Sequence, residues 1–172
     1  MRLTRVAKPF DGPDYIFELK HDGFRAIAYI DDECKLVSRN LNRFKSFESL
    51  WKSLDKLPVQ IAILDGEIVR VSQFNELFSR RGRPVFSAFD LLWLDGESLL
   101  DLPLGERKRL LEAVIADGDL VRRTASVRAP AERWQAQWRA SGFAQMAVKA
   151  ANGRYVPGAS SRDWVILPIP QP

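Results

Sequence analysis

The chain has 172 residues, 46% of them apolar, which is enough to bury a hydrophobic core within one domain. Its 26 basic and 22 acidic residues leave a net charge of +4, which permits a polyanionic partner without requiring one. One cysteine excludes an internal disulfide, and one histidine excludes a histidine zinc triad. Because no apolar run could span a bilayer and no signal peptide is evident, we expect a cytoplasmic protein without a membrane partner.

Residues 15–20 alternate in polarity, which predicts a strand with Glu18 and Lys20 on one face. Asp22–Gly23 predicts a turn, and Phe24–Ile30 predicts the next strand. If the two strands pair as a hairpin, the second carries an arginine back toward Lys20. A lysine amine attacks only when unprotonated, and a neighbouring cation or partial burial favours that form. Taken alone, the segment is more typical of a surface hairpin with solvated charges.

A further hairpin and a helix are expected next along the chain. Asp31–Glu33 predicts a tight turn before a strand at Lys35–Ser38, which favours antiparallel pairing. Ser46 is expected to cap a helix that carries one apolar stripe and ends before Pro58. That stripe indicates packing rather than chemistry.

Two carboxylates share one face of the next predicted strand, Gln60–Val71. Asp65 and Glu67 have apolar neighbours on both sides along that face. This favours a partly buried and partnered acidic site over a strand edge that faces water.

The second half of the chain continues the alternation of helices and strands without a repeat or a linker. One domain is therefore the simplest account. The predicted elements are helices at Gln73–Arg80, Leu104–Ile115 and Pro130–Ser141, the last closed by Gly142, and strands at Val85–Leu94, Gln145–Ala150 and Asp163–Ile169.

Several segments, taken together and in order, carry a resemblance to a known family. The segments are Lys20–Arg25, Ser38–Asn40, Leu64–Val69, Phe86–Gly96, Tyr155–Gly158 and Ser161–Trp164. Between about residues 8 and 168 the chain resembles the adenylation (nucleotidyltransferase) domain of ATP-dependent DNA ligases, and most of all the bacterial end-joining type. RNA ligases and capping enzymes share the Lys-x-Asp-Gly segment, but the run that begins at Phe89 is typical of DNA ligases.

The resemblance implies an α+β fold of the ligase nucleotidyltransferase (ATP-grasp-like) type. Such a fold has two antiparallel sheets flanked by helices, with a nucleotide groove between them. The chain ends at Pro172, directly after the last motif. We therefore expect a single adenylation domain over residues 1–172 and no OB-fold domain.

The resemblance also implies a role for each matching residue. Lys20 would be the catalytic nucleophile, which attacks the α-phosphate of ATP, releases pyrophosphate and retains AMP on its nitrogen. Arg25 and Glu67 would grip the ribose, since a guanidinium donates to hydroxyl oxygens and a carboxylate accepts from hydroxyls. Phe89 would stack on adenine. Glu18 would read the adenine edge.

Three more residues complete the implied cofactor-binding set. Leu19 belongs to it, and Lys149 falls on a basic position of the family pattern. Arg39 would position the ribose or a phosphate of the nicked strand, with an exposed turn as the alternative. Asp65 is expected to shape the local backbone rather than to touch nucleotide. The implied cofactors are ATP, with its AMP adduct, and Mg²⁺ or Mn²⁺, for which the sequence identifies no ligands.

Two departures from the family pattern concern its charged residues. The Glu-Gly-Ile-Val motif falls on Ala144–Ala147, and a methyl group cannot take the place of a glutamate that serves the metal. The Lys-x-Lys motif falls on Ile166 and Pro168. Loss of one such donor costs about 2–4 kcal/mol, so the loss of both lysines and the glutamate predicts a crippled first step. Arg154 or Arg162 is the candidate for a compensating cation.

Three functions are compatible with these features. The first is an adenylation domain that forms lysyl-AMP for DNA nick sealing in repair or recombination, acting on nicked or broken duplex DNA. The second is a catalytically impaired pseudo-ligase that binds adenine nucleotide or DNA. The third is a subunit that works with a separate OB-fold or end-binding protein. The first predicts an enzyme and the second does not, and the sequence leaves both open.

Overall fold

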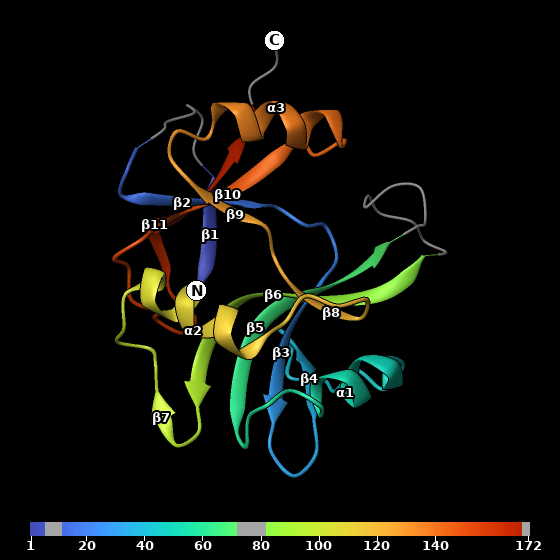
Figure 1. The fold of residues 1–172 in the computed structure, drawn as a ribbon. Coiled ribbons are helices and arrows are strands. Elements are labelled where there is room, and N and C mark those ends of the chain that lie inside the picture. The colour runs from blue at the N-terminus through green and yellow to red at the C-terminus, as the bar shows by residue number, and fades with distance from the viewer. Residues whose placement is uncertain (6–11, 72–81, 170–172) are drawn as a thin grey trace. The chain divides into compact units, whose positions relative to one another are not determined.

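The computed structural model describes residues 1–5, 12–71 and 82–169 (Figure 1). The chain forms two compact units, and each contains segments that are distant in sequence. Unit 1 consists of Met1–Lys20, Leu102–Gly105 and Ala125–Pro172, and unit 2 consists of His21–Asp101 and Glu106–Thr124. Within the described ranges, no helix is long and apolar enough to cross a membrane.

Unit 1 is built on a five-stranded sheet in the order β1-β11-β10-β2-β9. Its pairings are antiparallel, except that β1 runs parallel to β11. Strand β2 is buried on both faces from Ile16 to Leu19, and its two edges are paired with β10 and β9. The elements are β1 (Arg2–Arg5), β2 (Tyr15–Leu19), β9 (Ser126–Arg128), α3 (Glu132–Ala140), β10 (Gln145–Ala150) and β11 (Ser160–Pro168).

Unit 2 is built on a six-stranded sheet in the order β4-β3-β5-β6-β7, with β8 parallel to β6. Its apolar core contains side chains from all of the longer strands and from both helices, as the alternation of these segments predicts. The helix α2 starts at Leu104 in unit 1 and continues through unit 2. The elements are β3 (Phe24–Ile30), β4 (Lys35–Ser38), α1 (Glu48–Leu54), β5 (Ala62–Val71), β6 (Arg83–Leu94), β7 (Glu97–Ser98), α2 (Leu104–Val114) and β8 (Val121–Arg123).

These elements confirm the α+β class and most of the predicted segments. The turn between β3 and β4 and the strand β6, buried on both faces over most of its length, lie where the sequence places them. The predicted helix at Gln73–Arg80 lies outside the described residues. The short strands β1, β7, β8 and β9 were not predicted, because two to four residues are too few to show a period. Two of them, β1 and β8, add parallel pairs to the predicted antiparallel sheets.

Residues 15–20 and Phe24–Ile30 do not pair with each other as a hairpin. Strand β2 pairs with β9 and β10 in unit 1, whereas β3 pairs with β4 and β5 in unit 2. Both edges of β2 are therefore already hydrogen-bonded, which leaves no edge for β3. Strand pairing consequently does not carry Arg25 back to β2.

The predicted cap of α1 is wrong by one residue. Phe47, not Ser46, occupies the N-cap position, and no side chain caps the helix. Phe47 is buried together with Leu50 and Leu54 on the core side of α1. Tertiary packing of this face thus fixes where the helix begins.

Candidate active site

The first predicted ribose-binding residue, Arg25, is held rigidly within unit 2. It lies on β3, and its Nε and Nη2 donate to Oδ1 and Oδ2 of Asp65 on β5 at 3.0 and 2.6 Å. The Asp65 side chain is fully buried, whereas that of Arg25 remains 34% exposed. A paired-donor geometry of this kind fixes the plane of a guanidinium. The prediction that Asp65 shapes local hydrogen bonding agrees with this pairing.

The second, Glu67, lies two residues further along β5 and opposite Arg25 in the sheet register. Its Oε1 accepts a hydrogen bond from the backbone N–H of Gly23 at 2.6 Å. A Cβ atom on Gly23 would lie 2.3 Å from the carbonyl oxygen of Ile68, so only glycine permits this approach. The predicted partly buried and partnered pair of carboxylates, Asp65 and Glu67, is therefore confirmed.

The predicted adenine platform, Phe89, lies on β6 in the same unit. The guanidinium carbon of Arg25 lies 5.7 Å from the centre of the Phe89 ring, within the range of a cation–π contact. Both side chains are half-buried. Unit 2 thus brings together Arg25, Glu67 and Phe89, whereas Arg39 is exposed in the turn that follows β4.

Unit 1 brings together Glu18 and Lys149. The Nζ atom of Lys149 on β10 lies 2.6 Å from Oε2 of Glu18 on β2, and both side chains are 2% exposed. The same Nζ lies 4.1 Å from the centre of the Trp164 ring on β11. The indole and the carboxylate together compensate the buried ammonium group. The sequence did not reveal this pair, because Glu18 and Lys149 lie on strands that are paired in the sheet but far apart in the sequence.

The candidate nucleophile, Lys20, follows the last residue of β2 and is half-buried. The preceding residue, Leu19, is buried and donates its N–H to the carbonyl oxygen of Ala125 at 3.3 Å. Lys20 is also the last residue of the first segment of unit 1.

The two departures from the family pattern lie opposite each other in unit 1. Strands β10 and β11 pair Gln145 with Pro168 and Ala147 with Ile166. Ala144, where the family has its glutamate, accepts a hydrogen bond from Ile169 N–H through its carbonyl oxygen. The three positions of these departures therefore lie at the end of the strand pair where Gln145 faces Pro168.

The described residues offer no cluster of metal ligands. Among the described residues, no group of three or more His, Cys, Asp or Glu side chains could hold one. A magnesium ion requires oxygen ligands, and the side chain of Ala144 offers none.

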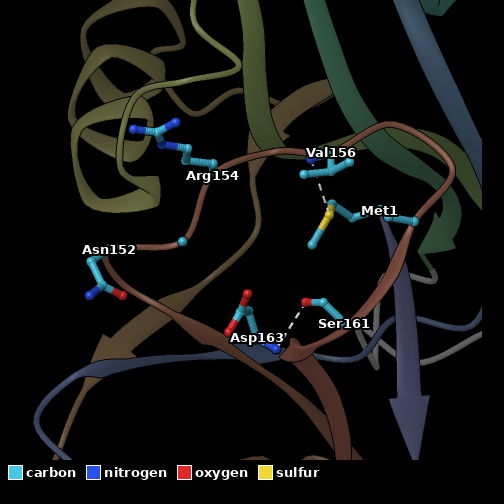
Figure 2. A pocket seen from close by; sticks show the side chains of 8 residues that line it. Met1, Asn152, Arg154, Val156, Ser161 and Asp163 are labelled. Carbon is cyan, nitrogen blue, oxygen red and sulfur yellow. Dashed lines mark hydrogen bonds between the residues drawn. The ribbon is translucent and has the colours of Figure 1, made fainter.

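Unit 1 also contains an open cavity of about 320 Å³ that sequence reasoning did not predict. Figure 2 shows Arg154 and Asn152 on one side of it, Met1 and Val156 on the other, and Asp163 below. Arg154, one of the two candidate compensating cations, thus lies at this cavity. Its lining contains none of the predicted nucleotide-binding residues.

Two buried polar groups in unit 2 were missed. His21 Nε2 lies 3.2 Å from Ser87 Oγ, which in turn lies 2.8 Å from Thr124 Oγ1. Asp90 on β6 accepts hydrogen bonds from Arg107 on α2 at 2.8 and 3.0 Å. A carboxylate inside the apolar strand was a usable signal for the second group, because a buried charge needs a partner.

Comparison with known proteins identifies the family. The model of the family described as "ATP dependent DNA ligase domain" matches residues 2–166. The chain belongs to this family. The resemblance drawn from the motifs is thereby confirmed.

The relatives of this ligase domain include end-joining proteins. The chain is 30% identical to the multifunctional non-homologous end joining protein LigD of Mycolicibacterium smegmatis, over 93% of this chain and 22% of that protein. It is similar to the crystal structure of the ligase domain of M. tuberculosis LigD, with a TM-score of 0.75 and 26% identity, over 95% of this chain and 58% of that one. It is also similar to a mycobacterial DNA ligase D in complex with ATP and MES, with a TM-score of 0.74 and 25% identity, over 95% of this chain and 59% of that one. The chain spans a third or less of the length of the first curated relatives that it matches.

Proposed function

We propose that residues 1–172 constitute one adenylation domain, which binds ATP and forms lysyl-AMP on Lys20 for the sealing of nicked or broken duplex DNA in repair or recombination. The observation that carries this proposal is the arrangement of Arg25 in unit 2. Asp65 fixes its guanidinium, Phe89 lies beside it, and Glu67 lies opposite on the neighbouring strand. A group held on strands in this way is preorganised for a sugar and a base. A ligase of similar fold has been seen with ATP.

The proposed reaction uses the Lys20 amine as its nucleophile. After losing a proton, Nζ attacks the α-phosphorus of ATP, a nitrogen–phosphorus bond forms, and the bond to pyrophosphate breaks. Arg25 and Glu67 hold the ribose hydroxyls, and Phe89 supports the adenine ring. Glu18 reads the adenine edge, with Leu19, Arg39 and Lys149 as further contacts.

Mass spectrometry tests the first step. Incubation with ATP and Mg²⁺ or Mn²⁺ should add the mass of AMP to a peptide that contains Lys20, and Lys20→Arg should abolish the addition. If the protein stays unmodified at saturating ATP, the proposed function is wrong.

A second candidate is a ligase-like domain that binds adenine nucleotide or DNA without catalysis. The departures at Ala144, Ile166 and Pro168 favour it, because they place uncharged residues at three neighbouring positions that are charged in the family pattern. Titration with ATP, AMP and nicked duplex distinguishes the two candidates. Binding without AMP transfer supports the second, and self-adenylation followed by sealing excludes it. Addition of a separate OB-fold protein to the sealing reaction tests the proposed partner.

A further inference from the structure

Two of the points at which the chain leaves one unit for the other are adjacent to polar anchors. Lys20 is the last residue of unit 1 before the chain enters unit 2 at His21. Thr124 is the last residue of unit 2 before the chain returns to unit 1 at Ala125.

The residues on the unit 1 side of these two points are bonded to each other. Strand β2 runs antiparallel to β9, with Glu18 opposite Ser126. Beyond this pair, Leu19 donates its N–H to the Ala125 carbonyl oxygen at 3.3 Å. The residue directly before Lys20 is therefore tied to the residue directly after Thr124.

The residues on the unit 2 side share one anchor, Ser87 on β6. Its hydroxyl lies 3.2 Å from Nε2 of His21 and 2.8 Å from Oγ1 of Thr124. The backbone N–H of Thr124 also donates to the carbonyl oxygen of Ala88 at 2.7 Å. All three side chains of this trio (His21, Ser87 and Thr124) are buried, so their hydrogen bonds are costly to break.

We propose that the His21–Ser87–Thr124 trio consists of positioning residues for Lys20. The trio fixes the backbone directly after Lys20, as the Leu19–Ala125 bond fixes it directly before. The proposal rests on the proposed function, in which Lys20 is the nucleophile. A nucleophile displaced by about 1 Å can lose on the order of a hundredfold in rate, so backbone anchoring on both sides has a direct kinetic effect.

Thr124 offers a matched pair of variants. Thr124→Val keeps the shape of the side chain and removes the hydroxyl, whereas Thr124→Ser keeps the hydroxyl. We expect the maximal rate of AMP transfer to fall about tenfold or more in Thr124→Val and in Ser87→Ala, with little change in the KM for ATP. Thr124→Ser should restore most of the rate. Thr4→Val is the control and should leave the rate unchanged, because Thr4 lies on the edge strand β1, where its hydroxyl donates to the carbonyl oxygen of Ser161 on β11.

A second readout does not depend on AMP transfer. Brief treatment with acetic anhydride followed by mass spectrometry gives the acetylation rate of Lys20 relative to the exposed Lys56. Release of the half-buried Lys20 should raise this ratio about threefold or more in Thr124→Val and Ser87→Ala, but not in Thr124→Ser. If the native chain accepts no AMP, the proposed function fails, and this ratio alone decides the positioning role.

Three results would overturn the inference. The first is that Thr124→Val and Ser87→Ala both fold and both keep the native transfer rate and the native acetylation ratio. The second is a loss confined to the KM for ATP, which would assign the trio to nucleotide binding. The third is loss of the fold in both Thr124→Val and Ser87→Ala, measured by circular dichroism, which would assign it a structural role alone.

Discussion

At the scale of single residues, the position of Arg25, the proposed ribose-binding residue, depends on a buried carboxylate. The fully buried Asp65 accepts two hydrogen bonds from the guanidinium. Asp65→Asn keeps the size of the side chain but removes its charge and one acceptor. We expect a loss of about 1.5–3 kcal/mol in unfolding free energy, measured by urea titration, together with weaker ATP binding.

Asp31→Asn is the matched control for that change. The Asp31 side chain is half-exposed, and its Oδ1 lies 4.0 Å from Nζ of Lys35. Loss of this charge should therefore lower the unfolding free energy by less than about 0.5 kcal/mol. Equal stability of the two variants would show that the Arg25–Asp65 pair does not contribute as its burial suggests.

Cys34 leads to a prediction about pH. Burial, followed by repulsion from Asp55, raises the pKa of this thiol from 9.0 to about 12. A thiol reagent at pH 8 should therefore leave the native protein unmodified and react fully in urea. Because the folded pKa is the higher one, the stabilisation is complete below pH 9 and is lost as the pH rises toward 12. Cys34→Ala should lose less stability across that window, as alkaline denaturation curves will show.

At the scale of elements, one ion pair joins α2 to β6. Arg107 and Asp90 are both fully buried, and Asp90 also accepts a hydrogen bond from the N–H of Leu91 at 3.0 Å. Removal of one charge leaves the other buried without its charged partner, so Arg107→Met should cost about 3–5 kcal/mol. The double change Asp90→Leu with Arg107→Met should be less harmful than either single change, and a double-mutant cycle in urea measures the coupling. Additive losses would contradict this account.

The pairing of β10 with β11 supports a gain-of-function prediction. Ala144 and Pro168 are exposed and Ile166 is half-buried, so all three positions can accept charged side chains. The triple variant Ala144→Glu, Ile166→Lys, Pro168→Lys should raise the rate of AMP transfer to Lys20 by at least about thirtyfold, since one such donor contributes about 2–4 kcal/mol. The isosteric control Ala144→Gln, Ile166→Met, Pro168→Met should not. An unchanged rate in the charged variant would mean that these positions do not limit the first step.

Prediction of the elements succeeded where a period of two or of three to four residues runs over many positions. Strand β5 and helix α1 belong to this group, because each was predicted from an apolar pattern that its own residues carry. The pairing of β2 could not be predicted in this way. Its neighbours β9 and β10 lie more than 100 residues away, and the alternation within β2 carries no information about its partners.

At the scale of the whole molecule, the main core belongs entirely to unit 2 and is drawn from residues between Ala26 and Val121. The fragment 21–124 contains this core, all strands of its sheet and the Asp90–Arg107 pair. We expect the fragment to fold by itself, with a cooperative thermal transition and with Cys34 still protected from thiol reagents. In contrast, fragment 1–124 should fail to form the unit 1 sheet, because β2 then lacks β9 and β10. A fragment 21–124 whose Cys34 reacts as fast as in urea would show that unit 2 requires unit 1.

The sequence by itself determined the family, the order of the motifs and the presence of a lysine, an arginine, two carboxylates and an aromatic ring suited to a nucleotide. These are properties of local spacing, which the chain carries whether or not it is folded. Only the tertiary structure decided that Asp65 holds Arg25, that Glu18 pairs with Lys149, and that Ser87 anchors His21 from 66 positions away. The physical reason is that a buried polar group takes whichever partner the packing of distant strands brings within hydrogen-bond distance.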